Sequence, residues 1–367
     1  MIMNEPPSGP TWVPHQRQTG WSCEPIDTAV HTFHRSLPGY APTPLVDVPA
    51  LAAELGVGRV LIKDESDRLG LPAFKALGAS WAVHRVVDAH PDHALTLVAA
   101  TDGNHGRAVA RFARLLGHRA EIYVPTGVHP TAIDAIAGEG AAVTVIDGSY
   151  DQAVAIASRA AEAPHAILVQ DMAWDGYVQI PRWIVEGYDT LFAEIDEQLT
   201  AAGVGRPDLV AVPTGVGSLL QAALAHYRSS DAAPGTAVVS VEPDAAACVA
   251  ASLSAGQPVT VDTRPTAMAG LNCGTPSMLA WPLISNGLDA ALTLTEEDGI
   301  QAAHDLAALG IPAGPCGAAP LGALRAALTG PDASERRLHL GLDRESVVIM
   351  LSTEGSTSNP VPELRNR

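Results

Sequence analysis

The sequence is poor in aromatic residues, in cysteine and in basic side chains. Phe, Trp and Tyr make up 4% of its 367 residues and hydrophobic residues 47%, so the apolar core must be built from Ala, Val, Leu and Ile. Lys and Arg number 22 against 40 Asp and Glu, which gives a net charge of −18 at pH 7. A surface this acidic repels nucleic-acid phosphates and anionic lipids. We therefore expect no nucleic-acid partner and no membrane partner.

Cysteine pairs and long apolar runs are also missing. The four cysteines, which are Cys23, Cys248, Cys273 and Cys316, form no CxxC pair and no metal-ligand spacing. This predicts reduced thiols and no bound metal. No uncharged segment reaches the ~18 residues that a membrane span requires. The opening MIMNEPPSGPTWVPHQ shows no basic region followed by an apolar stretch, so we predict no signal peptide and a cytoplasmic protein.

Short apolar segments rich in β-branched residues alternate with Ala/Leu-rich helical segments from Val60 onward. Apolar strands separated by helices of ~10–15 residues are typical of βαβ units in a parallel sheet covered on both faces. Because nine strands are many for one sheet, we predict an α/β fold with two open, mainly parallel twisted sheets. The predicted strands are 60–63, 95–100, 121–124, 142–146, 166–169, 209–212, 237–241, 290–294 and 347–351. Predicted helices include 104–116, 150–163, 217–227, 296–309 and 318–328. Residues 1–30 are predicted to form an extended arm or a loosely packed N-terminal segment, and residues 329–345 a surface loop.

Open parallel sheets bind ligands where strands end and helices begin, and four such junctions carry polar residues. The first, KDESDRLGLPAFK at 63–75, places Lys75 after Phe74 at a helix start. Burial disfavours an ammonium ion, and the neutral amine is what Schiff-base chemistry requires. The alternative is an ordinary surface lysine.

The second junction, ATDGNHGRAVA at 100–110, comes after an apolar strand. Asp102 and Asn104 there either cap the next helix or approach a planar ligand that the neighbouring glycines admit. We take His105 as structural.

The third junction, PTGVGSL at 213–219, is rich in glycine, and the fourth, LSTEG at 351–355, carries hydroxyls. Backbone N–H groups at the third junction and the dipole of the next helix form a phosphate cradle, unless the turn binds nothing. It lacks the GK[ST] ending of a nucleotide P-loop and the GxGxxG of dinucleotide sites. Ser352 and Thr353 at the fourth either hydrogen-bond a ring nitrogen or cap the next turn of the chain.

The order of these junctions resembles that of the tryptophan-synthase β-like (fold type II) family of pyridoxal phosphate (PLP) enzymes. Within it, the motifs are most similar to those of diaminopropionate ammonia-lyases. The matching stretches are PGYAPTPL, KDESDRLGLPAFKALG, ATDGNHGRAVA, VQDMAWDGY, PTGVGSL, MAGLNCG and STEGST, which lie between residues 38 and 357. The resemblance implies a larger PLP-binding domain of residues 1–84 and 186–367 and a smaller inserted domain of residues 85–185. It also implies a homodimer.

The resemblance assigns a role to each matching residue. Lys75 carries PLP beside Phe74, and Asn104 bonds the 3′-oxygen of the cofactor. Aspartates Asp102 and Asp171 act as bases, although a cap or turn role for Asp171 stays open. Thr353, or Ser352 beside it, faces the pyridine nitrogen. The phosphate is held by backbone N–H groups of Gly215, Val216, Gly217, Ser218 and Leu219.

Three features depart from the lyase pattern. Gly314-Pro315-Cys316-Gly317 replaces a Gly-Glu-Ser-Gly loop, the acidic residue after TEG is missing, and Pro72 stands where Asn is common. Outside the junctions, Arg68 either binds a substrate carboxylate or forms an ordinary ion pair. The pair His31 and His34 has no third metal ligand, which favours a packing role.

These observations lead to three functional hypotheses. The first is an α,β-elimination lyase that releases ammonia from a small amino acid such as 2,3-diaminopropionate and forms pyruvate. The second is a β-replacement synthase, or a serine or threonine dehydratase, that uses the same aminoacrylate. The third is a PLP-binding protein without turnover.

Overall fold

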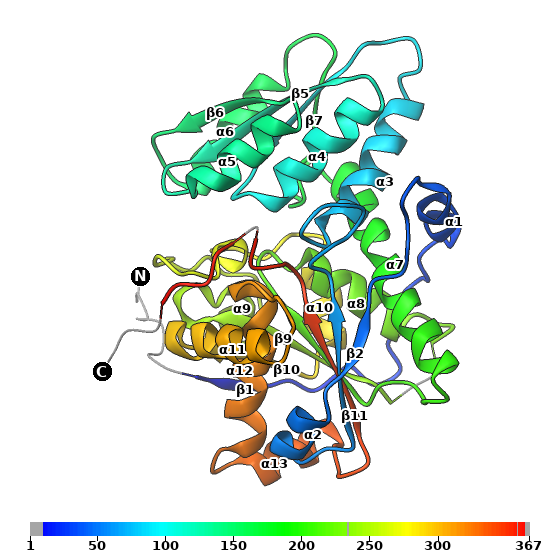
Figure 1. The fold of residues 1–367 in the computed structure, drawn as a ribbon, viewed down its shortest axis with the longest axis vertical. Helices are drawn as coiled ribbons and strands as arrows, with labels where there is room; N and C mark the ends of the chain where they lie inside the picture. The colour runs from blue at the N-terminus through cyan, green and yellow to red at the C-terminus, as the bar shows by residue number, and fades with distance from the viewer. Residues whose placement is uncertain (1–9, 233–234, 358, 364–367) are drawn as a thin grey trace. The chain divides into compact units, whose positions relative to one another are not determined.

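The computed structural model describes residues 10–232, 235–357 and 359–363 (Figure 1). The chain divides into two compact units, of which the larger comprises Met1–Ile26, Pro42–Ser66 and Leu191–Arg367, and the smaller Asp27–Ala41 and Asp67–Thr190. The smaller unit therefore starts earlier than the domain predicted at 85–185. The reason is that helix α3 (Lys75–Asp88) packs along α4 (Asn104–Leu115), so its whole length belongs to that unit.

The sheet of the larger unit has seven strands in the order β1-β10-β9-β8-β11-β3-β2. Neighbours from β10 to β3 are parallel, whereas both edge strands are antiparallel to theirs. The strands are β1 (Trp12–Pro14), β2 (Leu45–Asp47), β3 (Arg59–Asp64), β8 (Leu209–Pro213), β9 (Ala237–Pro243), β10 (Ala290–Leu294) and β11 (Val347–Ser352). The edge strands β1 and β2 were not predicted, because three residues are too few to show a period. Part of the expected N-terminal arm is thus a strand.

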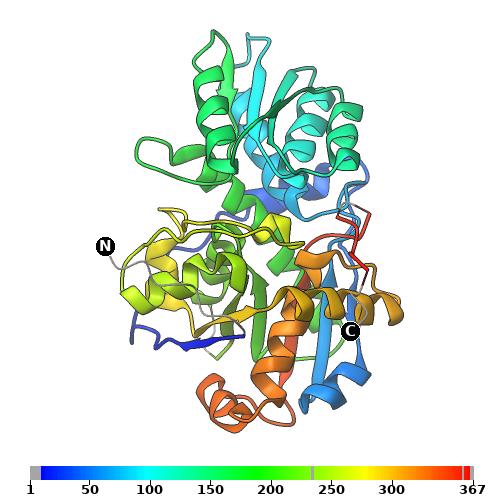
Figure 2. The ribbon, with the colours of Figure 1, turned by 90° about the vertical axis from the view of Figure 1, so that its left-hand side faces the viewer.

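Helices cover both faces of this sheet (Figure 2). Because side chains alternate along a strand, Leu209 and Ala211 of β8 pack in one core cluster with the apolar residues of α12, while Val210 and Val212 point to the opposite face. Helix α8 contacts β8 and β9. The helices are α2 (Pro49–Leu55), α8 (Ser218–Arg228), α9 (Cys248–Ala255), α10 (Trp281–Gly287), α11 (Glu296–Ala308), α12 (Pro315–Thr329) and α13 (Ala333–Leu340), with 3₁₀ turns at Asp244–Ala246 and Ala269–Leu271.

Helix α13 overturns the prediction of a surface loop at 329–345. Its sequence, ASERRLHL, buries only Leu340 and shows no apolar stripe. Gly341 ends the helix in the left-handed conformation with φ of 69°, a C-terminal signal typical of glycine. The sequence therefore contained a helix-ending glycine, but the charged residues before it favoured the prediction of a loop.

The sheet of the smaller unit is fully parallel, in the order β6-β5-β4-β7. Val98 and Ala100 of β4 form a core cluster with Ala153 and Ala157 of α6. Helix α4 contacts β4 and β5 as well, and the alternation of β4 places it on the other face. The elements are β4 (Thr96–Ala100), β5 (Arg119–Pro125), β6 (Ala142–Ile146), β7 (Ala166–Leu168), α1 (Ala29–Ser36), α3, α4, α5 (Pro130–Gly138) and α6 (Tyr150–Ala160). Helix α7 (Gln179–Ala201) begins in this unit and ends in the larger one.

The predicted α/β fold with two mainly parallel sheets is confirmed, and each of the nine predicted strands is present. The four polar junctions come after β3, β4, β8 and β11, which end at Asp64, Ala100, Pro213 and Ser352. We searched the described residues for a helix long and apolar enough to span a membrane and found none.

Candidate active site

Lys75 is the first residue of α3, and its side chain is 22% exposed. Its Nζ lies 2.5 Å from Oδ2 of Asp171, which comes from the loop after β7. The Phe74 and Tyr188 rings have their centroids 5.2 Å and 5.8 Å from Nζ. Lys75 therefore lies beside a buried carboxylate and two aromatic rings and is not an ordinary surface lysine.

The loop that carries Asp171 is fixed by its neighbours. Tyr177 Oη accepts from the Gln170 N–H and donates to the Leu168 carbonyl, at 2.8 Å and 2.9 Å. Gln170 Oε1 accepts from the Ala100 N–H at 3.0 Å, which ties the end of β7 to the end of β4. Asp171 itself is buried. The VQDMAWDGY motif thus holds one carboxylate in place against Lys75.

Asp102 lies in the turn between β4 and α4, and its pKa is shifted in the opposite sense to that of Asp171. Burial, followed by the negative charge of Asp171, raises the pKa of Asp102 to about 7. Burial also acts to raise the pKa of Asp171, but the Lys75 ammonium outweighs it and holds that pKa well below the ordinary range. Two carboxyl groups whose pKa values are pushed apart suit one acid and one base.

The turn before α4 is capped by Thr101, whose Oγ1 accepts from the N–H groups of Gly103 and Gly106. This leaves the Asp102 carboxyl out of the capping role that its position also allowed. Gly103 adopts φ of 147°, and a Cβ at Gly106 would lie 2.4 Å from Cγ2 of Thr101, so both glycines are required. Asn104 begins α4 in this turn.

His105 is a structural residue of the same turn, as predicted. Its Nε2 bonds the Val169 carbonyl at 2.7 Å, and burial lowers the pKa of the ring, so the imidazole is neutral. The bond joins α4 to the segment that carries Asp171.

Tyr188 was missed by the sequence analysis because an aromatic residue inside a long helix reads as core. It is fully buried, which raises the pKa of its phenol, while the interaction with Lys75 acts to lower that pKa. Its ring lies 4.8 Å from that of Phe74, between centroids. The sequence feature that could have indicated it is a glycine inside each of two helices, Gly78 in α3 and Gly187 in α7, because such glycines allow helices to pack closely. A Cβ at Gly187 would lie 2.6 Å from Cα of Gly78, so the two helices touch through their backbones.

In the larger unit, the glycine-rich loop after β8 presents backbone N–H groups. Within the described part of the chain, the N–H groups of Gly215, Val216 and Gly217 donate to no backbone carbonyl. Ser218 and Leu219 form the first turn of α8, and the positive end of the helix dipole lies there. A Cβ at Gly215 would lie 3.0 Å from Sγ of Cys273, and Gly217 adopts φ of 95°. Side chains at these glycines would occupy the space beside the backbone N–H groups. The loop therefore has the geometry of an anion site.

The end of β11 carries a buried hydroxyl that is not satisfied. Ser352 is fully buried, and in the described ranges its Oγ has no hydrogen-bond partner. Thr353, the next residue, is 3% exposed. A buried hydroxyl without a partner is costly, and it suits a ligand atom such as a heterocyclic nitrogen. Together with the anion cradle, it fits a phosphorylated pyridine such as PLP.

Gly314–Gly317, where the sequence departs from the lyase pattern, form the N-cap and the first turn of α12 and pack directly on the Ser352 turn. Glu354, which is buried, accepts at Oε1 from the Cys316 N–H at 3.3 Å and from Asn359 Nδ2 at 3.3 Å. A Cβ at Gly317 would lie 3.0 Å from Ser352 Oγ and 2.9 Å from the Glu354 carbonyl oxygen. Burial, and then Glu354, raise the pKa of Cys316 well above its ordinary value, so the thiol is not a nucleophile.

The remaining residues singled out by sequence contact neighbouring parts of the chain. Arg68 is fully buried, and its Nη1 lies 3.5 Å from the Ala41 carbonyl oxygen. His31 bonds Asp189 at 2.8 Å, and His34 bonds Thr190 at 2.7 Å. The packing role favoured for the two histidines agrees with these contacts. In the described ranges, no cluster of three or more His, Cys, Asp or Glu side chains is placed to hold a metal ion.

The chain belongs to the pyridoxal-phosphate dependent enzyme family, whose model matches residues 37–352. It is 37% identical to diaminopropionate ammonia-lyase of Escherichia coli (strain K12) over 350 residues, which cover 89% of this chain and 87% of that protein. The crystal structure of an Escherichia coli diaminopropionate ammonia-lyase with an aminoacrylate-PLP azomethine intermediate superposes with a TM-score of 0.87 at 33% identity. That match covers 95% of this chain and 94% of the other. The structure of the Escherichia coli enzyme with D-serine gives a TM-score of 0.88 at 32% identity, with the same coverage.

Proposed function

We propose that this protein is a carbon–nitrogen lyase that catalyses α,β-elimination on a small diamino acid such as 2,3-diaminopropionate. With one water consumed, the products are pyruvate and two molecules of ammonia. The observation that carries the proposal is the 2.5 Å contact between Lys75 and Asp171, with Asp102, whose pKa burial raises to about 7, in the turn after the neighbouring strand β4. A departing amine needs a proton, and Cα must lose one, so the reaction requires both an acid and a base.

In this proposal each residue acts at a stated atom. PLP, when bound, supplies the electron sink for the electrons left at Cα. Lys75 would hold the cofactor through its side-chain amine. Asp171, ionised, accepts the Cα proton, and Asp102 delivers a proton to the departing β-nitrogen. The resemblance also allows each aspartate to act as the base for one substrate enantiomer.

The remaining assignments concern the cofactor. Asn104 would donate to its 3′-oxygen, and Phe74 would lie beside the lysine that holds it. Ser352 or Thr353 would hydrogen-bond the ring nitrogen. A hydroxyl cannot protonate that nitrogen as a carboxylic acid can, so charge at Cα would be stabilised less and departure of a β-substituent would be favoured. The backbone N–H groups of Gly215, Val216, Gly217, Ser218 and Leu219 would hold the phosphate.

The decisive assay incubates the PLP-loaded protein with D- and L-2,3-diaminopropionate and measures pyruvate and ammonia. We expect two ammonia for each pyruvate. Asp102→Asn and Asp171→Asn should each lower kcat by about 10²-fold or more, with the larger loss on opposite enantiomers if each serves as a base. Asp175→Asn is the matched control, because this exposed aspartate lies in the same loop as Asp171. Failure to form either product from either enantiomer would refute the substrate assignment.

A second candidate is a β-replacement synthase or a serine or threonine dehydratase. It is favoured by Gly314–Gly317, where Pro315 and Cys316 stand in place of the usual Glu and Ser and the Cys316 N–H donates to Glu354 beside the Ser352 turn. Incubation with serine or threonine, with and without an added thiol, distinguishes these reactions. A new amino acid in excess of the oxo acid indicates replacement, and an absorbance band that no amino acid changes indicates binding without turnover.

We further propose that the protein acts in the cytoplasm as a homodimer. The support is the family resemblance and the lack of cysteine pairs in the sequence. Sedimentation analysis of the PLP-loaded protein tests the dimer.

A further inference from the structure

A polar cavity of about 570 Å³ lies in the larger unit, beside the segment directly after β1. This volume is in the range of small-molecule sites. One part of the lining is the run 15–21, and the rest comes from Arg228, Asn286, Asp289 and His339. None of these residues belongs to the junctions assigned to PLP.

The run 15–21 is held in place by backbone hydrogen bonds. The His15 N–H donates to the Asp289 carbonyl at 2.8 Å, and the Gln18 N–H to the Asn286 carbonyl at 2.9 Å. Directly before it, Trp12 to Pro14 pair with β10. The cavity wall is therefore attached to the sheet and to the end of α10, which makes the cavity a preformed feature.

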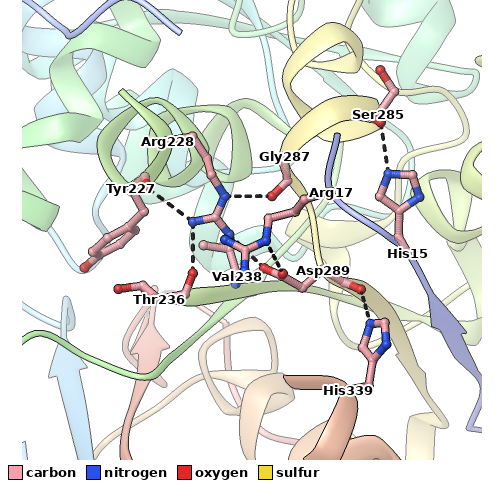
Figure 3. A network of polar contacts seen from close by, with 10 residues as sticks. All are labelled: His15, Arg17, Tyr227, Arg228, Thr236, Val238, Ser285, Gly287, Asp289 and His339. Atoms are coloured by element: carbon pink, nitrogen blue, oxygen red, sulfur yellow. Dashed lines mark hydrogen bonds and ion pairs between the residues drawn. The ribbon is translucent and has the colours of Figure 1, made fainter. Parts of the chain in front are cut away.

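Two arginines converge on one carboxylate at this cavity (Figure 3). Arg228 is buried and uses its guanidinium on the Gly287, Tyr227 and Thr236 carbonyls and, at 2.7 Å, on Asp289 Oδ2. Arg17 approaches Asp289 Oδ1 through Nε at 2.8 Å, and its side chain is 40% exposed. An arginine has five N–H donors, so the terminal nitrogens of Arg17 remain available to a ligand. Asp289 Oδ2 also accepts from the Val238 N–H at 2.7 Å, so this carboxylate is already well satisfied.

The other polar groups of the lining suit hydroxyls. His15 Nε2 lies 2.9 Å from the Ser285 carbonyl and His339 Nε2 lies 2.8 Å from the Asp289 carbonyl (Figure 3). A neutral imidazole that donates from Nε2 presents an acceptor at Nδ1. Gln16, Gln18 and Thr19 add amide and hydroxyl groups.

We propose that this cavity binds a small hydroxylated organic anion, whose carboxylate or phosphate is held by the terminal nitrogens of Arg17. Two arginines against one aspartate leave a local excess of positive charge in a chain of net charge −18. At physiological ionic strength the charge of the rest of the chain is screened beyond about 8 Å. The two arginines at the cavity therefore determine which ligand charge is attracted. The bound anion would join the run 15–21 to the sheet.

The test is calorimetric titration of the PLP-loaded protein, whose phosphate cradle is then occupied. The probes are citrate and glucose 6-phosphate, as hydroxylated carboxylate and phosphate, with inorganic phosphate and glucose as the partial structures. We expect citrate or glucose 6-phosphate to bind more tightly than inorganic phosphate and glucose. Arg17→Gln should raise the dissociation constant of the organic anion that binds by roughly 10- to 100-fold, which is the range for the loss of a hydrogen bond to a charged group.

Arg59→Gln is the matched control, because Arg59 also pairs with a single aspartate, Asp47, and its side chain is 35% exposed. It should leave the dissociation constant unchanged. Hydrogen exchange of residues 15–21 should slow when the anion binds to the wild type and not to Arg17→Gln. The proposal is overturned if neither organic anion binds, if inorganic phosphate binds as tightly, or if Arg17→Gln binds like the wild type.

Discussion

The raised pKa of Asp102 makes a quantitative prediction about folding. Burial, with a further contribution from Asp171, shifts this pKa from 3.8 to about 7. A displacement of the pKa by about 3 corresponds to about 4 kcal/mol, at about 1.4 kcal/mol for each tenfold change in the ionisation constant. For a carboxyl group whose pKa is raised by folding, the unfolded chain loses the proton first as pH rises. The free energy of unfolding therefore falls between pH about 4 and about 7 and is constant above, for a total of up to about 4 kcal/mol.

Asp102→Asn removes the titrating group with little change of shape, so this loss should be absent from the variant. Between pH about 5 and about 8, the ionisation of this group lowers the free energy of unfolding of the wild type by about 3 kcal/mol. The variant should become more stable than the wild type by that amount over this interval. The assay is the denaturation midpoint of both proteins across this interval, without cofactor, because attachment of PLP removes the Lys75 charge that acts on Asp102.

Asp175→Asn, at an exposed position of the Asp171 loop, serves as the control and should track the wild-type profile. If the Asp102→Asn and wild-type profiles run parallel across the interval, Asp102 is ionised in the folded protein at neutral pH. The division of roles between the two aspartates would then lose its basis.

Three further predictions concern single side chains. Lys75→Ala should abolish turnover, and borohydride reduction of the PLP-loaded wild type should label position 75, as peptide mass mapping can show; a label elsewhere would contradict the assignment. Ser352→Ala should leave the denaturation midpoint of the cofactor-free chain unchanged or higher, because the buried hydroxyl has no partner among the described residues. The same variant should weaken PLP binding by about tenfold, and a loss of stability without loss of PLP affinity would argue for a purely structural hydroxyl. Gly317→Ala should destabilise the fold by about 1–3 kcal/mol, as measured by urea denaturation. The reason is that its Cβ would lie 2.9 Å from the Glu354 carbonyl oxygen. Unchanged stability would mean that the turn can shift to accommodate the methyl group without a cost in free energy.

The sequence predicted every strand except the two short antiparallel edge strands of the larger sheet. Strands such as β8, whose five residues are all buried, consist of apolar residues without interruption and are recognisable locally. β1 and β2 have three residues each and depend on a partner distant in the chain, which no local pattern reveals. Helix α13 has the opposite difficulty, because a charged helix that buries one residue looks like a loop.

The candidate site was predictable where a motif sits at the end of a strand. Lys75 and Asp102 could be named from their junctions, but the opposite shifts of the pKa values of Asp102 and Asp171 could not. Those shifts depend on burial and on the 2.5 Å contact between Lys75 and Asp171, residues 96 positions apart. Tyr188 escaped for a similar reason, since only the folded chain places its ring near the lysine.

The backbone contact between Gly78 and Gly187 has a consequence for protein engineering. A single methyl group at either glycine would have to separate α3 from α7, because a Cβ at Gly78 would lie 2.5 Å from the Tyr188 ring and 2.8 Å from the Ile184 carbonyl oxygen. Lys75 is the first residue of α3, one turn from Gly78. Displacement of that helix therefore carries the reactive amine away from its carboxylate. Alanine at either position would appear in a screen as failure to retain the coenzyme, although the clash itself lies between the two helices.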